Sequence, residues 1–124
     1  MKSLMEENIQ ELVDLCFGNA KAAGWHSSIG DPAVEKYLKP AQLMLMVSEI
    51  AEAMEGERKD LMDDHIKHRK MAEVELADAV IRIADYCGRW GYDLGGAIVD
   101  KLEYNKNRMD HRPEERIKQN GKKF

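Results

Sequence analysis

Apolar residues in the first part of the chain recur at the three- and four-residue spacing of one α-helical face. Ile9, Val13 and Cys16 show this spacing, which predicts a helix from about residue 4 to Ala23. Gly24 follows directly and is expected to end that helix.

Three further helices are predicted downstream. Asp31 before Pro32 has the form of a helix N-cap followed by proline, and opens a short turn through Leu38. A second helix runs from Pro40 to about Arg58, a third covers residues 71–90, and a fourth covers 94–108. The apolar stripes that predict them are Leu43, Val47, Ile50 and Met54 in the second, Leu76, Val80, Ile83 and Cys87 with Val74, Ala77, Ile81 and Ala84 in the third, and Leu94, Ile98 and Leu102 in the fourth.

The predicted fold class is all-α, with a four-helix bundle-like core, because no segment alternates apolar and polar residues as a strand does. Met44 and Leu45 lie off the main stripe of the second helix and would stay wet in a monomer. We therefore expect homo-oligomerisation, to a dimer or a tetramer, to complete the core. Residues 1–109 form the expected domain, and residues 110–124 a basic, irregular or partner-dependent tail.

Composition narrows the class of function. The chain has 124 residues, enough for one domain, and its 19 basic and 23 acidic residues leave a formal charge of -4. This balance gives no general attraction to nucleic acid polymers or to anionic membranes. The sequence has no secretory signal and no membrane-spanning apolar run, which favours a cytoplasmic protein. Cys16 and Cys87 lie inside apolar patterns and are expected to be small buried hydrophobes.

Two pairs of carboxylates interrupt the apolar helices. Glu49 and Glu52 are three residues apart and share a face of the second helix, and Glu75 and Asp78 repeat this spacing in the third. If these helices pack antiparallel, the four groups converge, and two such charges about 4 Å apart repel by roughly 4 kcal/mol at a dielectric near 20. A hard cation such as Mg²⁺ would relieve this repulsion. Alone, either pair could instead be solvated, and Asp78 could pair with Arg82 on its own helix.

The blocks "SEIAEAMEGERK" and "ELADAVIRI" together resemble the E-x-x-E, spacer, E-x-x-D pattern of the MazG-like, all-α nucleoside triphosphate pyrophosphohydrolases, with 22 residues between Glu52 and Glu75. The resemblance runs from about Gln42 to Arg108. It implies a Mg²⁺-dependent hydrolase of the α–β phosphoric anhydride bond, with Mn²⁺ as a substitute ion, that converts a nucleoside triphosphate to the monophosphate and pyrophosphate. The expected role is cleansing of the nucleotide pool, with the base and sugar left open.

The resemblance also implies roles for individual residues. Glu49, Glu52, Glu75 and Asp78 would be the catalytic metal ligands, with Glu52 the first choice for a general base that orients the attacking water. The substrate-binding candidates are Lys101, Asn105 and Arg108 on one face of the fourth helix, Arg58 at the end of the second, and Trp25 and His26 in the first loop. Each group also has a structural alternative. The residues of the fourth helix could form a solvated surface, Arg58 could complement the helix dipole, and the aromatic loop residues could cover the end of the bundle.

Two rival functions differ in chemical class. A di-iron carboxylate bundle needs E-x-x-H on two helices, and no glutamate in the chain has histidine three residues later. His65 and His68 lie among aspartates in a polar connection that lacks a tetrahedral ligand set. The second rival is a non-catalytic helical module that binds a nucleotide or a partner and has a regulatory role.

Overall fold

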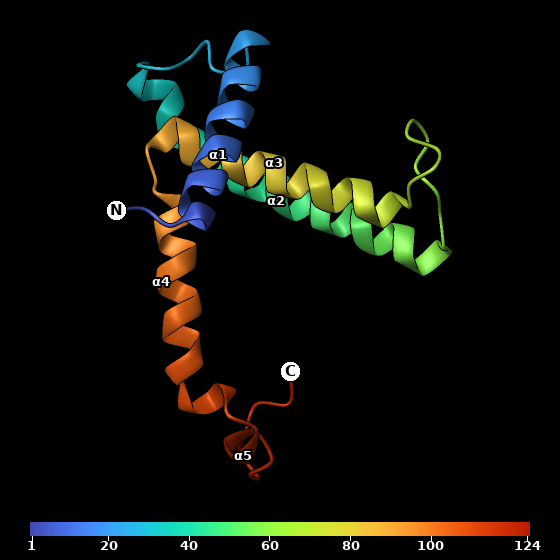
Figure 1. Ribbon diagram of the computed structural model, residues 1–124. Helices are drawn as coiled ribbons and strands as arrows, with labels where there is room; N and C mark the ends of the chain where they lie inside the picture. Colours follow the sequence, from blue (N-terminus) through green and yellow to red (C-terminus); the bar gives the residue numbers. More distant parts are fainter. The chain divides into compact units, whose positions relative to one another are not determined.

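The protein is described here by a computed structural model that covers residues 1–124, and its regular structure is helical throughout, which confirms the all-α prediction (Figure 1). The elements are α1 (Leu4–Ala22), α2 (Pro32–Lys59), α3 (Met71–Trp90), α4 (Leu94–Asn107), the 3-10 turn η1 (Met109–His111) and α5 (Pro113–Arg116). None of these helices is long and apolar enough to cross a membrane. The chain forms two compact units, Glu11–Tyr92 and Met1–Gln10 with Asp93–Phe124. The expected domain of residues 1–109 with a tail of residues 110–124 stays a prediction.

Helices α2 and α3 form an antiparallel pair that dominates the packing of the first unit (Figure 1). At one end of the pair, a Cβ atom placed on Gly56 would lie 2.9 Å from Cβ of Met71, so only glycine allows this approach. At the other end, the indole nitrogen of Trp90 donates to Oε1 of Gln42 at 3.0 Å. These contacts fix the register of the two helices along most of their length.

Helix α2 does not begin at Pro40 as the sequence predicted, because the segment from Pro32 onward is already part of it. Proline inside a helix removes one hydrogen-bond donor and disfavours the turn before it. Contacts with the end of α3 hold the chain on both sides of the proline. Lys39 places its ammonium 4.6 Å from the Trp90 ring centroid, and Gln42 accepts from the same indole.

The N-cap at Asp31 is confirmed, since its side chain accepts from the backbone nitrogen of Ala33 at 3.1 Å. Helix α1 approaches α3 closely at one point, where a Cβ atom on Gly88 would lie 2.5 Å from Cβ of Phe17. Cys16 and Cys87 are both free and buried, which confirms their expected character. Burial also raises the pKa of each thiol, as expected for a structural cysteine.

The second unit is built on α4. Asp93 caps this helix by accepting from the backbone nitrogen of Gly96 at 3.0 Å. The tail, expected to be irregular, contains η1 and α5 and folds back on itself. An ion pair stabilises this folded-back tail, with the ammonium of Lys122 2.8 Å from the Asp110 carboxylate.

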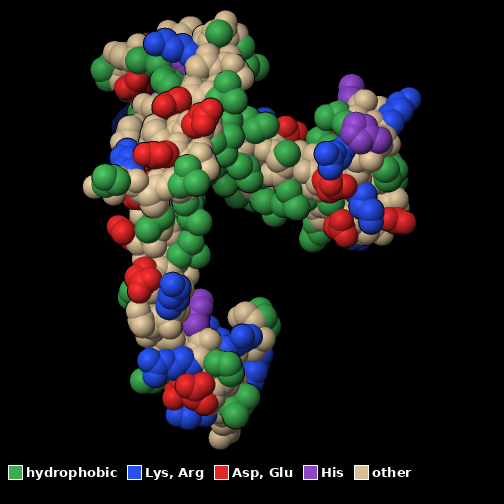
Figure 2. Space-filling view, viewed as in Figure 1, with side chains coloured by type: hydrophobic (Ala, Val, Ile, Leu, Met, Phe, Trp, Pro, Cys, Tyr) green, Lys and Arg blue, Asp and Glu red, His purple; other side chains and the backbone are tan.

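One long edge of the α2/α3 pair is apolar and exposed to solvent (Figure 2). We call it the apolar edge, and its residues are Leu43, Val47, Ile50, Met54, Leu76, Val80 and Ile83, between 36% and 59% exposed. The sequence predicted these stripes as core, but within the chain's first unit no third helix covers them. Met44 and Leu45 are also exposed, as expected for a single chain.

Candidate metal centre

Three of the four predicted carboxylates come together between α2 and α3. Oxygen atoms of Glu49, Glu52 and Glu75 all lie within 4.8 Å of one another, and we call this group the acidic trio. Glu49 is buried, Glu75 is half-buried and Glu52 is exposed. The trio is therefore closed on the side of the helix pair and open on the side of Glu52.

The register of the two helices explains this convergence. Glu49 and Glu75 face each other across the pair, and Glu52 and Asp78 each follow three residues later. Three residues rotate a side chain by about 60° from the facing position, toward the edge opposite the apolar one. The same helical offset thus aims both second carboxylates at one side of the pair.

The ionisation of Glu75 reflects its neighbours. Burial raises the pKa of the Glu75 carboxyl to about 8, and hydrogen bonds with Glu49 and Glu52, together with their charges, act in the same direction. At neutral pH and without a cation, a proton is therefore retained on Glu75. A site of carboxylate oxygens that must hold a proton when no cation is bound suits a hard divalent ion such as Mg²⁺.

Asp78 lies beside the acidic trio but outside the group of mutually close oxygens. Burial raises the pKa of its carboxyl, the charges of Glu49, Asp63 and Glu52 raise it further, and that of Arg82 lowers it. Asp63 belongs to the segment between α2 and α3, where its side chain accepts from the backbone nitrogens of His65 and Ile66 at 2.9 and 2.7 Å. The sequence analysis interpreted this segment as a polar linker. In the structure, the negative charge of its Asp63 also acts on Asp78.

Arg82 is ion-paired with the acidic trio. Its Nε donates to Oε1 of Glu49 at 2.9 Å, across from α3 to α2. The alternative of a pair with Asp78 on the same helix is not formed, although Arg82 still lowers the pKa of that carboxyl. The cross-helix pair satisfies one oxygen of a buried carboxylate, which is the kind of support that orients metal ligands.

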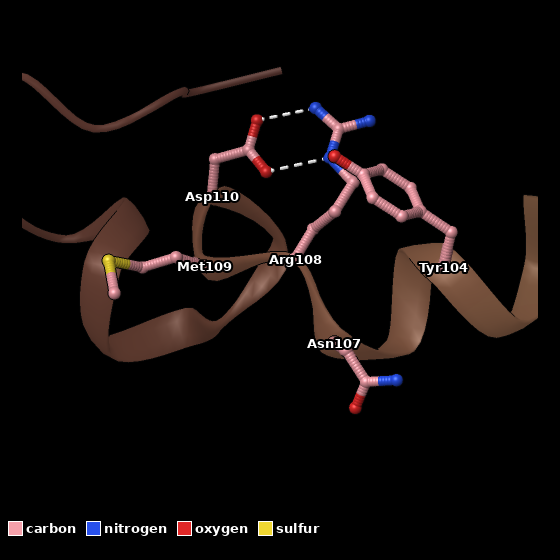
Figure 3. Close-up of a pocket in the computed structure, with 5 residues that line it drawn as sticks. All are labelled: Tyr104, Asn107, Arg108, Met109 and Asp110. Atoms are coloured by element: carbon pink, nitrogen blue, oxygen red, sulfur yellow. Dashed lines mark hydrogen bonds and ion pairs between the residues drawn. The ribbon is translucent and has the colours of Figure 1, made fainter.

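The candidates predicted on the fourth helix belong to the other compact unit. Lys101 and Asn105 lie on α4, whereas Arg108 directly follows it, because the helix ends at Asn107. Arg108 makes a two-point pair with Asp110, from Nε at 3.0 Å and from Nη2 at 2.6 Å, which raises the pKa of the guanidinium (Figure 3). Lys101 places its ammonium 4.7 Å from the Tyr104 ring centroid, and the buried Oδ1 of Asn105 accepts no hydrogen bond. An open pocket of about 440 Å³ is lined by Tyr104, Asn107, Arg108, Met109 and Asp110 (Figure 3). The charge of Arg108 is thus already engaged within its own unit.

The two aromatic candidates of the first loop differ sharply in exposure. Trp25 is 77% exposed, whereas His26 is 5% exposed and packs edge-on against Phe17. Nε2 of His26 lies 2.6 Å from Asp85, and Nδ1 lies 2.7 Å from Nη1 of Arg89. Since a guanidinium only donates, Nδ1 is the acceptor, which assigns the ring proton to Nε2. His26 therefore ties the loop to α3, and a contact with a nucleobase stays a prediction for it, as for Trp25 and the exposed Arg58.

A stripe of charge along α3 was only partly recognised in the sequence. Its residues are Glu75, Asp78, Arg82, Asp85 and Arg89. They alternate at three- and four-residue spacing, the same signal that identifies an apolar face. Applying that periodicity to charged residues would have pointed to Arg82, Asp85 and Arg89 beside the two recognised ligands.

The sequence matches no protein-family model and no curated protein, and the structure matches no solved structure. The resemblance to MazG-like pyrophosphohydrolases therefore rests on the two acidic motifs and their placement.

Proposed function

We propose that the protein is a Mg²⁺-dependent nucleoside triphosphate pyrophosphohydrolase of the MazG-like type. The observation that carries the proposal is the meeting of Glu49, Glu52 and Glu75 within 4.8 Å, at the motif positions of two packed helices. The reaction forms a bond between a water oxygen and the α-phosphorus and breaks the α–β anhydride bond. The products are a nucleoside monophosphate and pyrophosphate.

The four carboxylates have distinct surroundings that suggest distinct roles. Glu49, Glu75 and Asp78 are at least half-buried and would hold the ion, while the exposed Glu52 would hold the proton of the attacking water. A bound divalent cation would neutralise the triphosphate and polarise its P–O bonds. The proton that Glu75 retains in the free site must leave when the ion binds.

The residues that would bind the base, the sugar and the phosphates are assigned from the family resemblance alone. Trp25 offers an exposed indole that could stack on a base, and Lys101, Asn105, Arg108 and Arg58 remain the cationic and polar candidates for phosphates and sugar. Removal of non-standard or excess nucleotides from the pool is the role that such an activity would serve.

The proposal includes a homo-oligomer, with a dimer as its smallest form. The apolar edge is supporting evidence, because seven half-exposed apolar side chains along one side of a helix pair form a surface that proteins usually bury. A second antiparallel pair laid on this edge would make a four-helix core.

The reaction is tested by incubating the protein with a panel of nucleoside triphosphates, with Mg²⁺ or with chelator, and separating mono-, di- and triphosphates by chromatography. We expect Mg²⁺-dependent monophosphate and pyrophosphate. Glu75→Gln should abolish turnover, whereas Glu57→Gln, at an exposed glutamate of α2 outside the trio, should not. Full activity in Glu75→Gln would contradict the site.

The same experiment distinguishes this proposal from the alternative of a non-catalytic binding module. A protein that releases no product from any nucleotide, yet melts at a higher temperature when Mg²⁺ and a nucleotide are added, would favour the binding role.

A further inference from the structure

Arg82 occupies a position in the candidate metal centre that a charge-balancing role alone does not explain. Its side chain is 42% exposed, while the Glu49 side chain that it contacts is 11% exposed. The guanidinium therefore joins a nearly buried member of the acidic trio to the solvent-exposed surface of the helix pair.

Only one of the three guanidinium nitrogens is used within the protein. Nε donates to Oε1 of Glu49 at 2.9 Å, and neither Nη1 nor Nη2 makes a hydrogen bond. A guanidinium whose sole purpose was to pair with Glu49 would gain most from a two-point contact, as Arg108 makes with Asp110. Arg82 instead keeps its two terminal nitrogens free.

The charges around Arg82 indicate what these nitrogens would bind. Arg82 is ion-paired with Glu49 of the acidic trio, and its charge also acts on Asp78. An anion that arrives with a cation bound by these carboxylates would therefore come close to the guanidinium. Arginine recognises phosphoryl oxygens with paired N–H donors, and does so best when its orientation is already fixed. The bond to Glu49 supplies that fixed orientation.

We propose that Arg82 is a phosphate-binding residue of this site, in which Nε orients Glu49 while Nη1 and Nη2 donate to oxygens of the substrate's polyphosphate. The inference rests on the proposed function and adds a residue outside the E-x-x-E and E-x-x-D motifs. It makes Arg82, on the same unit as the carboxylates, the principal cationic contact of the polyphosphate.

The test measures binding of inorganic pyrophosphate to the full-length protein by isothermal titration calorimetry at saturating Mg²⁺. Arg82→Lys keeps the charge and loses the paired donors, and Arg82→Gln loses both. We expect pyrophosphate affinity to fall about 10-fold in the first and about 100-fold in the second, with KM for the best nucleotide rising in the same order. Arg69→Lys is the matched control, because Arg69 also pairs with a glutamate, Glu73, at the exposed surface of the protein.

A role limited to holding Glu49 gives a different result. It predicts weaker binding of Mg²⁺, seen as a smaller rise in melting temperature with Mg²⁺ alone, and unchanged pyrophosphate affinity once Mg²⁺ is saturating. That outcome, or equal pyrophosphate affinity in wild type and both Arg82 variants, overturns the inference while leaving the proposed function in place. A wild-type protein that neither binds pyrophosphate nor hydrolyses any nucleotide overturns both.

Discussion

At the scale of single residues, Glu75 links the chemistry of the site to the stability of the fold. Its pKa is raised from the ordinary value of 4.5 to about 8, so the folded state resists the loss of this proton more than the unfolded state does. Between these two values the folded state binds more protons, and stability must fall as pH rises. Asp78, whose pKa is also raised, acts in the same direction.

We therefore expect the melting temperature of the metal-free protein to decrease as pH rises from the ordinary pKa of 4.5 to the raised pKa of about 8 of Glu75, and to level off above it. Glu75→Gln should flatten this dependence and melt at a higher temperature than wild type at the alkaline end. Differential scanning fluorimetry in chelator measures both. Parallel curves for the two proteins would show that Glu75 ionises normally.

Mg²⁺ should reverse the alkaline loss in wild type, because the cation replaces the proton among the carboxylates. The rise in melting temperature caused by Mg²⁺ is expected to grow with pH and to be small in Glu75→Gln. A rise of equal size at every pH would indicate that the ion binds elsewhere.

Neighbouring residues in the first loop offer a second test at this scale. His26→Phe keeps a ring against Phe17 but leaves Asp85 and Arg89 without their shared partner, at a cost of about 1–3 kcal/mol. Trp25→Phe changes an exposed ring and should alter the free energy of unfolding by less than about 0.5 kcal/mol. Urea denaturation measures the two values, and similar losses would contradict the described anchoring of the loop.

At the scale of elements, the position of α2 against α3 decides whether the carboxylates meet. Gly56 lies at a close approach of the two helices, opposite Cβ of Met71 and the backbone nitrogen of Ala72. A displacement of the helices here would carry through the rigid pair to Glu52 and Glu75. The motif spacing alone would not then assemble a site.

Gly56→Ala should destabilise the protein by about 1–3 kcal/mol, even though alanine favours helices, because its methyl group must push α3 away. Gly18→Ala in α1 is the control, since nothing lies within 4 Å of a Cβ there, and it should stabilise by about 0.5–1 kcal/mol. Urea denaturation tests both, and Mg²⁺-dependent stabilisation should weaken only in Gly56→Ala. A stabilised Gly56→Ala protein would contradict the close approach.

The same scale shows how far sequence periodicity reaches. The third helix was predicted within its observed bounds, Met71–Trp90, because apolar spacing and Gly91 define both ends. The predicted start of α2 at Pro40 was wrong. Contacts of Lys39 and Gln42 with Trp90, which is distant in sequence, outweigh the effect of the proline. Helical spacing correctly predicted that Glu49, Glu52 and Glu75 would lie close together. It could not predict whether Arg82 pairs with Asp78 or with Glu49. That choice depends on the register between helices, which no single helix encodes.

At the scale of the whole molecule, the apolar edge is a row of exposed apolar side chains along the α2/α3 pair. Ile50 lies near its centre and is 50% exposed. The proposed four-helix arrangement of two chains would place this side chain in a shared core. The oligomeric state therefore has a residue-level test.

Wild type should elute as a dimer or larger assembly in size-exclusion chromatography with light scattering, and Ile50→Lys should shift it toward the monomer because a buried ammonium is costly. Tyr37→Lys, at a 66% exposed position of α2 outside the apolar edge, is the control and should leave the mass unchanged. Monomeric wild type, or an unchanged mass in Ile50→Lys, would show that this edge does not mediate association.

In the proposed dimer, the apolar edge leaves water only when two chains meet, so dilution would destabilise the protein. Mass action removes about 1.4 kcal/mol of a dimer's stability with each tenfold dilution. The melting temperature should therefore depend on protein concentration, and turnover per chain should decline when an assay is run far below the dissociation constant. An activity that looks weak at high dilution would then reflect separated chains, and restoring the concentration would restore it.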